Sequence, residues 1–298
     1  MPGISQPSNS TPERLVADLV FLLDLEPRGG DRYIGRRRED GTGRVFGGQA
    51  IAQALGAAQR TVDPDRAAHS LHAYFLRPGD DALPVEYRVK RDLDGRSFSN
   101  RRVVASQNGQ PILNLTASFQ RPVEGPQHQH RPMPDVPPPE ELRPDAEIRL
   151  EIARQIPEGT IRQLLKRPMP VDIRSVEPRD WLDPQQRQPL GHVWFRTVGQ
   201  LPLERAVHQA VLAYVSDFQI LATALQPFGK SLHRGDVKAA SLDHAIWFHQ
   251  DFAIDDWLLY VTDAPWSGGG RGFARGEVFT RDGRLVASVS QEGMIRHL

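Results

Sequence analysis

The most conspicuous absence in this sequence is cysteine, which occurs nowhere among the 298 residues. Disulfide bonds, thiolate nucleophiles and cysteine-ligated metal sites are therefore excluded. Net charge is absent as well, because 37 Lys and Arg residues balance 37 Asp and Glu residues. Since nucleic-acid-binding proteins concentrate positive charge, we expect no nucleic-acid partner.

Long apolar runs are also missing. No stretch approaches the roughly 18 consecutive apolar residues of a membrane-spanning helix, so we expect no membrane insertion. The N-terminal sequence MPGISQPSNSTPE has neither the basic nor the apolar segment of a signal peptide. With 39% hydrophobic and 25% charged residues, the composition is typical of a folded cytoplasmic protein with two modest domains or one large domain.

Hydrophobic periodicity predicts helices and strands along most of the chain. Apolar residues at helical spacing predict helices at 13–25, 44–62, near 147–155 and at 205–225, with Thr11 as a cap for the first. Apolar runs bounded by turn signals predict strands at 69–76, 84–93, 97–109, 110–120, 191–198, 237–249, 256–265, 271–283 and 284–295.

The order of these elements repeats once. Asn108-Gly109 and Asp282-Gly283 are hairpin turn signals that lie 174 residues apart, and similar strands flank each turn. A helix followed by a meander of about four antiparallel strands, present twice, indicates two α+β units. We expect these units at 1–123 and 146–298, each with its helix wrapped by its own sheet.

A proline-rich stretch separates the two copies. Residues 124–145 have no apolar period, so we expect an extended linker without a core of its own. His128 and His130 lie in this stretch, but two histidines without further ligands favour a solvated linker over a metal site.

The predicted helix at 205–225 contains an acid where the pattern calls for apolar side chains. As one helix, it places His208, Ser216, Gln219 and Thr223 on the solvent side and Asp217 among apolar neighbours. An ionised carboxylate removed from water costs several kcal/mol unless it is paired. The alternative is a second, shorter helix that starts at Ser216, with Asp217 as a first-turn acid.

Three polar side chains distinguish the second copy from the first. Gln291 stands where the first copy has Ala117, and Asp217 has no counterpart in the first helix. Ser241 opens the segment SLDHAIWFH, which echoes HSLHAYF of the first copy. Strand alternation directs Gln291 toward the core. An acid that activates water, an amide that holds it and a hydroxyl that completes the hydrogen bonds form a plausible general-base set. The alternative is a buried polar network that only fixes packing.

Other motifs carry weaker signals. The segment 229–231 lacks the first glycine and the preceding strand of a phosphate-binding loop, and no Gly-x-Ser-x-Gly elbow of a serine hydrolase is present. For the glycine-rich segment 268–272, a flexible hairpin loop is favoured over a ligand-phosphate contact at Arg271. A structural role in strands is favoured over catalysis or metal binding for four histidines: His69, His72, His244 and His249.

Several segments together resemble one known family. VFGGQAIAQAL, HSLHAYFLRPGD, SFSNRRVVASQNGQPI, LAYVSDF, SLDHAIWFH and RGFARGEVFTRDGRLVASVSQEGMIR are similar to the type II acyl-CoA thioesterases, which have a double hot-dog fold. The resemblance implies that Asp217 is the catalytic acid that orients the water and that Gln291 binds this water. Ser241 stands where many members have Thr.

The resemblance also implies a reaction and its partners. The expected reaction is hydrolysis of fatty acyl-CoA to free fatty acid and CoA, without metal or cofactor, in a homo-oligomer such as a dimer or tetramer. The preferred acyl length would depend on the depth of a cavity between helix and sheet. Two alternatives remain: a hot-dog protein that binds acyl thioesters without turnover, and an acyl-CoA dehydratase, which usually needs a His and Asp pair on the helix.

Overall fold

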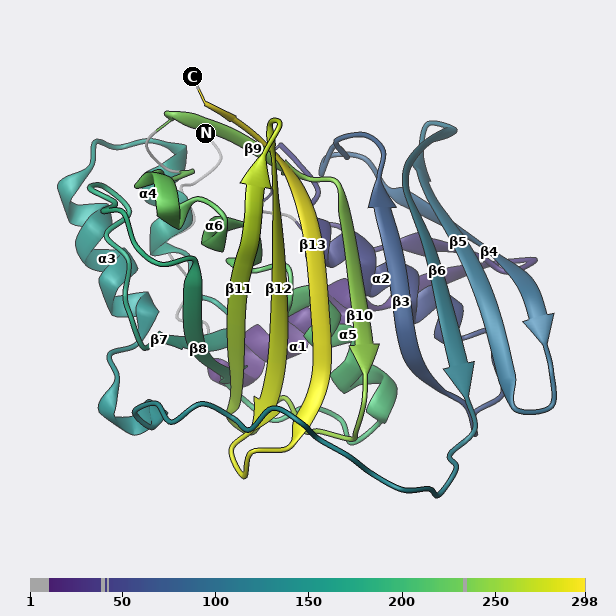
Figure 1. Ribbon diagram of the computed structural model, residues 1–298. Helices are drawn as coiled ribbons and strands as arrows, with labels where there is room; N and C mark the ends of the chain where they lie inside the picture. The colour runs from purple at the N-terminus through teal and green to yellow at the C-terminus, as the bar shows by residue number, and fades with distance from the viewer. Residues whose placement is uncertain (1–10, 39–40, 42, 233–234, 298) are drawn as a thin grey trace.

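One antiparallel sheet organises the molecule. The computed structural model describes residues 11–38, 41, 43–232 and 235–297. Its strands follow the order β1-β2-β4-β5-β6-β3-β10-β13-β12-β11-β8-β7, with β9 paired to β13 (Figure 1). Their bounds are β1 Leu25–Gly29, β2 Arg32–Gly35, β3 Ala67–Phe75, β4 Val85–Asp94, β5 Phe98–Gln107, β6 Gln110–Gln120, β7 Val171–Ser175, β8 Leu190–Thr197, β9 Val237–Ser241, β10 Asp243–Phe248, β11 Leu258–Gly268, β12 Arg271–Thr280 and β13 Leu285–His297.

The two copies meet in the middle of this sheet. Strand β3 of the first copy pairs with β10 of the second, and Leu71 lies opposite Ile246. The expected pair of α+β units therefore shares one continuous sheet, and the double hot-dog expectation is confirmed. The first copy's last strand ends at Gln120 and the next α-helix begins at Asp145. The division into units 1–123 and 146–298 stays a prediction.

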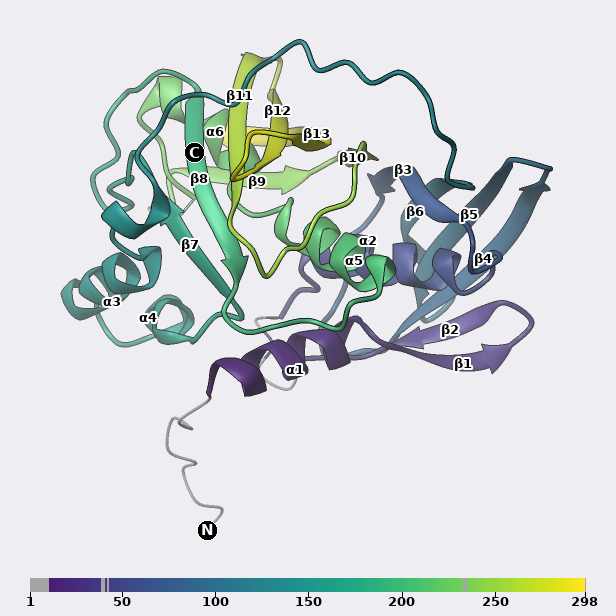
Figure 2. The same ribbon diagram turned by 90° about the horizontal axis from the view of Figure 1, so that it is seen from below.

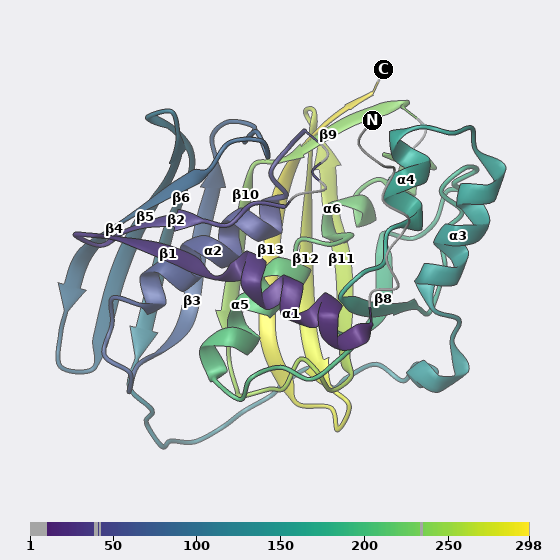
Figure 3. The same ribbon diagram turned by 180° about the vertical axis from the view of Figure 1, so that it is seen from behind.

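The helices lie on one face of the sheet and beyond one of its edges. Figure 3 shows α1, α2 and α5 in front of the strands. Helices α2 and α5 contact each other side by side. Each helix therefore packs against the other helix as well as against its own sheet, and only the contact with the sheet was expected. The helical bounds are α1 Pro12–Leu23, α2 Gly47–Gln59, α3 Asp145–Gln155, α4 Thr160–Lys166, α5 Arg205–Val215 and α6 Ile220–Thr223, with short 3₁₀ turns η1 Pro139–Glu141 and η2 Gln226–Phe228.

Small side chains allow the close approach of α2. Ala50, Ala54, Ala57 and Ala58 of α2 are buried, and alanine brings a helix axis nearer to its neighbours than a larger side chain would. Helix α2 therefore packs closely against the sheet and α5. Thr11 caps α1, because its hydroxyl accepts the Arg14 N–H at 3.3 Å.

Several strand boundaries differ from the sequence prediction. The strand predicted at 237–249 divides at Leu242 into β9 and β10, which both pair with β13. The Asn108-Gly109 turn is confirmed, since both residues have positive φ, 48° and 74°. Strands β1, β2 and β7 and helix α4 were not predicted, because each has only four to seven residues and is interrupted by charged side chains.

The proline-rich linker is bound to the outer face of the sheet. Residues 121–138 form no helix or strand, and they cross the strands on the side away from α2 and α5 (Figure 2). Met133 and Val136 pack against a cluster that includes Trp194 of β8, whose indole N–H donates to the Pro137 carbonyl at 2.9 Å. The predicted linker, 124–145, also includes the 3₁₀ turn Pro139–Glu141 and the first residue of α3. Its proline-rich part covers part of the core of the second copy.

Among the described residues, no helix combines the length and the apolar character needed to cross a membrane.

Candidate active site

The second-copy helix ends earlier than predicted, and this break creates the site. Helix α5 stops at Val215, and α6 begins only at Ile220. Between them Gln219 adopts the left-handed region with φ 60°. The prediction of one helix over 205–225 is therefore wrong. The alternative, a break at Ser216, is closer, although Asp217 lies in the turn rather than in the first turn of a new helix.

The solvent side predicted for this segment is also wrong. His208, Ser216 and Thr223 are all buried. His208 accepts the Ile254 N–H at 3.1 Å, so it is held by the loop before β11. This segment is buried on every side, by the sheet on one face and by α1, α2 and the 139–190 region on the others. A helical period identifies a solvent side only when one face is exposed, so it gave the wrong answer here.

Tyr260 of β11 fixes the turn after α5. Its hydroxyl donates to the Ser216 carbonyl oxygen at 3.0 Å, which satisfies an acceptor at the helix end. Burial raises the pKa of Tyr260, so this hydroxyl keeps its proton. Gly276 on β12 makes room for the ring, because a Cβ at that position would collide with Tyr260. A tyrosine and a glycine on neighbouring strands thus set the place of Asp217.

Asp217 faces the start of the first-copy helix. Its Oδ2 accepts the Gly48 N–H of α2 at 2.8 Å, one of the backbone donors that a helix start leaves free. A Cβ at Gly47 would lie 2.7 Å from the same oxygen. The two glycines therefore let α2 approach the carboxylate closely, and the first copy contributes a backbone N–H to a side chain of the second.

The structure brings the three predicted site residues together. Ser241 ends β9 and pairs with Gly293 of β13, two residues after Gln291. The Gln291 amide nitrogen donates to Ser241 Oγ at 2.8 Å, and Gln291 is buried, as the strand alternation predicts. Hydrogen bonds from both side chains act on the Asp217 carboxylate.

The surroundings of Asp217 favour its neutral form. Burial raises the pKa of Asp217 to about 7, and hydrogen bonds from Gly48, Gln291 and Ser241 oppose this rise. Part of the apolar wall is an aromatic cluster of Phe46, Tyr214 and Phe218, whose ring centroids lie 5.2 to 5.3 Å apart. A carboxyl group with a pKa near neutrality can both take up and release a proton in the physiological range.

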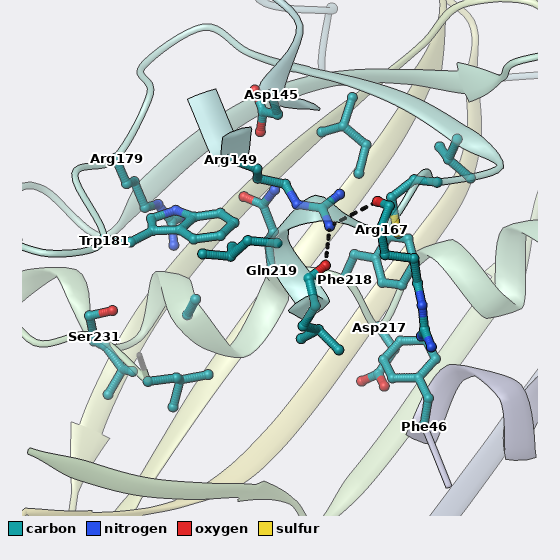
Figure 4. A pocket seen from close by; sticks show the side chains of 18 of the residues that line it. Phe46, Asp145, Arg149, Arg167, Arg179, Trp181, Asp217, Phe218, Gln219 and Ser231 are labelled. Atoms are coloured by element: carbon teal, nitrogen blue, oxygen red, sulfur yellow. Dashed lines mark hydrogen bonds between the residues drawn. The ribbon is translucent and has the colours of Figure 1, made fainter. Parts of the chain in front are cut away.

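Asp217 lies in the wall of a cavity of about 490 Å³. Figure 4 shows Asp217 and Phe46 at one side of this cavity and Arg179 and Trp181 at the other. Its apolar lining includes Leu164, Leu165, Met169, Val171, Ile173, Trp181, Phe218, Ala222 and Leu225. Ser241 and Gln291 are not among the lining residues that the structure describes; they reach Asp217 from the sheet side.

A covering region, residues 139–190, forms much of this cavity. Helices α3 and α4 pack together there, and Arg149 of α3 donates to the Leu164 and Arg167 carbonyl oxygens at 2.8 and 3.3 Å (Figure 4). Asp145 accepts the Ser175 N–H and hydroxyl at 2.9 and 2.8 Å, which ties α3 to β7. The cavity lies between the α5–α6 turn and the covering region, and Val171 and Ile173 of strand β7 form part of its wall.

Some contacts near the site were not predicted. His244, expected only to have a structural role in a strand, contacts both Gln291 and Ser216, and no role was predicted for Tyr260. A histidine within an otherwise apolar strand was the available signal for His244. In the part of the chain that the structure describes, no three His, Asp or Glu side chains gather as a group that could hold a metal ion.

A double hot-dog architecture with a carboxylate in the wall of an internal cavity defines the class of this protein. A family model described as acyl-CoA thioesterase matches residues 170–294, and one described as acyl-CoA thioesterase N-terminal domain matches residues 37–120. The chain belongs to the type II acyl-CoA thioesterase family.

Individual proteins support this membership. Acyl-CoA thioesterase 2 of Haemophilus influenzae is 37% identical over 282 residues, which are 95% of this chain and 98% of that protein. The crystal structure of acyl-CoA thioesterase II TesB2 from Mycobacterium marinum is 39% identical with a TM-score of 0.76, and covers 93% of this chain and 97% of its own. A hot-dog protein of unknown function from Alicyclobacillus acidocaldarius, 20% identical with a TM-score of 0.74, covers 94% of this chain and 98% of its own and shows the fold.

Proposed function

We propose that this protein hydrolyses fatty acyl-CoA to free fatty acid and CoA, with Asp217 as the general base. The observation that carries the proposal is the position of Asp217, a carboxylate with a pKa near 7 in the wall of a largely apolar cavity. The related proteins named as acyl-CoA thioesterases support the choice of substrate.

The proposed reaction uses water directly. The Asp217 carboxylate takes a proton from a water molecule as the water oxygen attacks the thioester carbonyl carbon. Gln291 and Ser241 hold the water and the carboxylate in line. When the tetrahedral intermediate collapses, the carbon–sulfur bond breaks and the proton returns from Asp217 to the CoA sulfur. The products are a free fatty acid and CoA with a thiol.

The acyl chain fits the apolar side of the cavity. Leu164, Met169 and Trp181 supply apolar walls there, and burial of each methylene group of a ligand contributes about 0.8 kcal/mol. We infer that the covering region, rather than the helix–sheet interface, limits the acyl length.

The direct test is release of free thiol from a series of acyl-CoAs of increasing length. Replacement of Asp217 by Asn keeps the shape and removes the base, so kcat is expected to fall by about 10²–10⁴ with little change in substrate binding. Near-native turnover by the Asn variant would contradict the assignment. Tight binding of acyl-CoA by the wild type without thiol release would instead indicate a non-catalytic binding protein.

A second measurement separates water attack from an acyl-enzyme on Ser241. A serine nucleophile needs an adjacent base and accumulates a covalent intermediate, whereas Ser241 accepts a hydrogen bond from an amide. We expect no burst of CoA release and no acylated protein after rapid quench. An acyl group found on Ser241 by mass spectrometry would overturn the mechanism and leave the thioesterase activity standing.

A cytoplasmic role in fatty acid metabolism and assembly into a dimer or tetramer belong to the same proposal. Tyr74 of β3 and Trp247 of β10 leave exposed aromatic surface on the outer face of the central strands, 62% and 36% of each residue, which supports a further contact. Sedimentation equilibrium measures the oligomeric state, and a monomer at micromolar concentration would contradict that part.

A further inference from the structure

A chain of four polar side chains connects the end of α5 to the sheet. Ser216 Oγ lies 2.9 Å from His244 Nε2, His244 Nδ1 contacts the Gln291 amide oxygen, and the Gln291 amide nitrogen lies 2.8 Å from Ser241 Oγ. Ser216 and Gln291 are 1% exposed and His244 is 0% exposed. These three side chains are shielded from bulk water, so their donors and acceptors must be matched mainly within the chain.

The ionised form of Asp217 sets the direction of these hydrogen bonds. A carboxylate only accepts, and a primary amide has one accepting and one donating end. Gln291 stabilises the carboxylate, so its N–H groups must point toward Asp217 and Ser241. Its oxygen is then turned toward His244, where only an N–H can meet it.

The imidazole has a single proton for this purpose. Burial lowers the pKa of His244 to about 4, and the hydrogen bond with Gln291 opposes this shift. The neutral ring therefore carries its proton on Nδ1 and accepts at Nε2 from the Ser216 hydroxyl. In solution the Nε2–H tautomer is the commoner form of histidine, so the arrangement is imposed by the site.

The reverse arrangement is chemically complete but conflicts with the base. There, His244 Nε2–H donates to Ser216, the Ser216 hydroxyl donates to the Ala213 carbonyl at 3.1 Å, and a Gln291 N–H donates to His244 Nδ1. The Gln291 oxygen would then face the Asp217 carboxylate, and two acceptors would oppose each other. The reverse arrangement suits only a protonated Asp217.

We propose that His244, as the neutral Nδ1–H tautomer, is a positioning residue that holds the amide oxygen of Gln291 and so keeps its N–H groups directed at Ser241 and Asp217. This inference rests on the proposed hydrolysis, because it assigns a role within that site. His244 does not line the cavity and has no exposed surface, so it acts through Gln291 rather than on the substrate.

The first test needs no substrate. Nitrogen-15 spectra of histidine-labelled protein at pH 8 distinguish the two tautomers, and the spectrum of His244→Asn identifies the resonances of His244. We expect a protonated Nδ1 and an unprotonated Nε2. A protonated Nε2 would overturn the proposal, whether or not the protein hydrolyses acyl-CoA.

The second test uses the two isosteres of histidine. The amide of Asn can place an N–H near the position of Nδ1, while Gln reaches toward the position of Nε2. We expect His244→Gln to lower kcat by about 10–100-fold with KM within about 3-fold, and His244→Asn to retain kcat within about 5-fold. His69→Gln on β3, whose ring contacts Ser118 Oγ at 2.8 Å, is the matched control and should leave kcat unchanged.

A double-mutant comparison separates positioning from folding. If His244 acts through Gln291, His244→Gln should lower kcat by less than about 2-fold in a Gln291→Ala background. An equal loss in both backgrounds, or wild-type kcat in His244→Gln, would contradict the proposal. If wild-type protein releases no thiol from any acyl-CoA, the proposed function fails, and the tautomer measurement still decides the hydrogen-bond arrangement. Melting temperatures identify variants that do not fold. If a variant does not fold, the tautomer of His244 measured in the wild-type protein decides the proposal.

Discussion

The two central helices occupy equivalent places and have different ends. Helix α2 is continuous from Gly47 to Gln59 and starts at the site, whereas α5 stops at Val215 and is followed by the turn that contains Asp217. The first copy therefore presents a helix start with free N–H groups, and the second presents a helix end with an acid. The comparison teaches that the break in one of two similar helices is what places the proposed base, Asp217, beside the start of the other.

The break changes what surrounds the carboxylate. In an uninterrupted helix, Asp217 would point into the apolar core, where an unpaired charge costs several kcal/mol. In the turn, it meets the Gly48 N–H and the cavity instead. The start of the intact helix thus stabilises the acid that the broken helix exposes.

The largest effect that would sharpen this contrast is the pH dependence of kcat/KM. The acid proposed as the base, Asp217, lies in the second copy and has a pKa of about 7, so kcat/KM should be constant above about pH 8 and fall about 10-fold per unit below 7. At pH 5 the loss is about 100-fold. A profile that stays flat to pH 5 would contradict Asp217 as the base.

The same titration affects folding in the opposite direction. A carboxyl group whose folded pKa is raised binds more protons in the folded than in the unfolded state. Its contribution to the free energy of unfolding is present below about pH 4 and is lost as the pH rises through 7. Urea denaturation of the wild type should show this loss, and Asp217→Asn should lack it.

The approach of α2 can be disturbed with little change to α5. Gly47→Ala places a methyl group against Asp217 Oδ2, so we expect kcat to fall by about 10–100-fold as the carboxylate moves. Gly56→Ala on the same helix is the control, because its nearest neighbour would lie 3.7 Å away. That change should keep kcat and stabilise the helix by about 0.5–1 kcal/mol. Equal kinetics for both variants would show that the helix start is not needed.

The covering region, residues 139–190, has no counterpart in the first copy and offers a test of specificity. Trp181→Ala should enlarge the apolar side of the cavity, so the ratio of kcat/KM for long over medium acyl chains is expected to rise about 10-fold. Trp266→Ala, at a partly exposed position outside the cavity, should leave the ratio unchanged. An unchanged ratio in Trp181→Ala would place the acyl chain elsewhere.

The smallest effect is expected at Ser241. Ser241→Thr preserves the hydroxyl that accepts from Gln291, so kcat should stay within about 3-fold, while Ser241→Ala should lose only part of the rate. Thiol-release assays on both variants check this order. A Thr variant that is weaker than the Ala variant would indicate that the added methyl group displaces Gln291.

The sequence identified the unusual acid but not the break beside it. Asp217 stands out from its apolar neighbours, whereas the helical period continues from Ala213 across the turn to Leu221. The left-handed residue in the turn is Gln219 rather than a glycine, so the sequence contains no signal for this conformation. The hydrogen bond from Tyr260 to the Ser216 carbonyl oxygen stabilises the end of α5. Tyr260 is distant in sequence, so a local pattern cannot predict this contact.

The strand histidines show the same limit. The dipeptide His-Ala occurs at His72 in β3 and at His244 in β10, yet His72 is exposed against Trp247 and His244 is buried. The interruption at Leu242 sets which face His244 occupies, and a shift of one residue reverses the face of a side chain. The repeat therefore predicted two similar strands but not the inward histidine.

The pairing of β3 with β10 has a consequence for any attempt to divide the protein. Each half on its own would expose a central strand with a row of unpaired backbone N–H and C=O groups, a template for association with another chain. We expect an isolated half to pair with a second copy of itself or to aggregate. In the intact chain, residues 121–138 connect the two halves, so β3 and β10 meet at a high effective concentration. Their pairing is therefore favoured over pairing with a strand of another molecule.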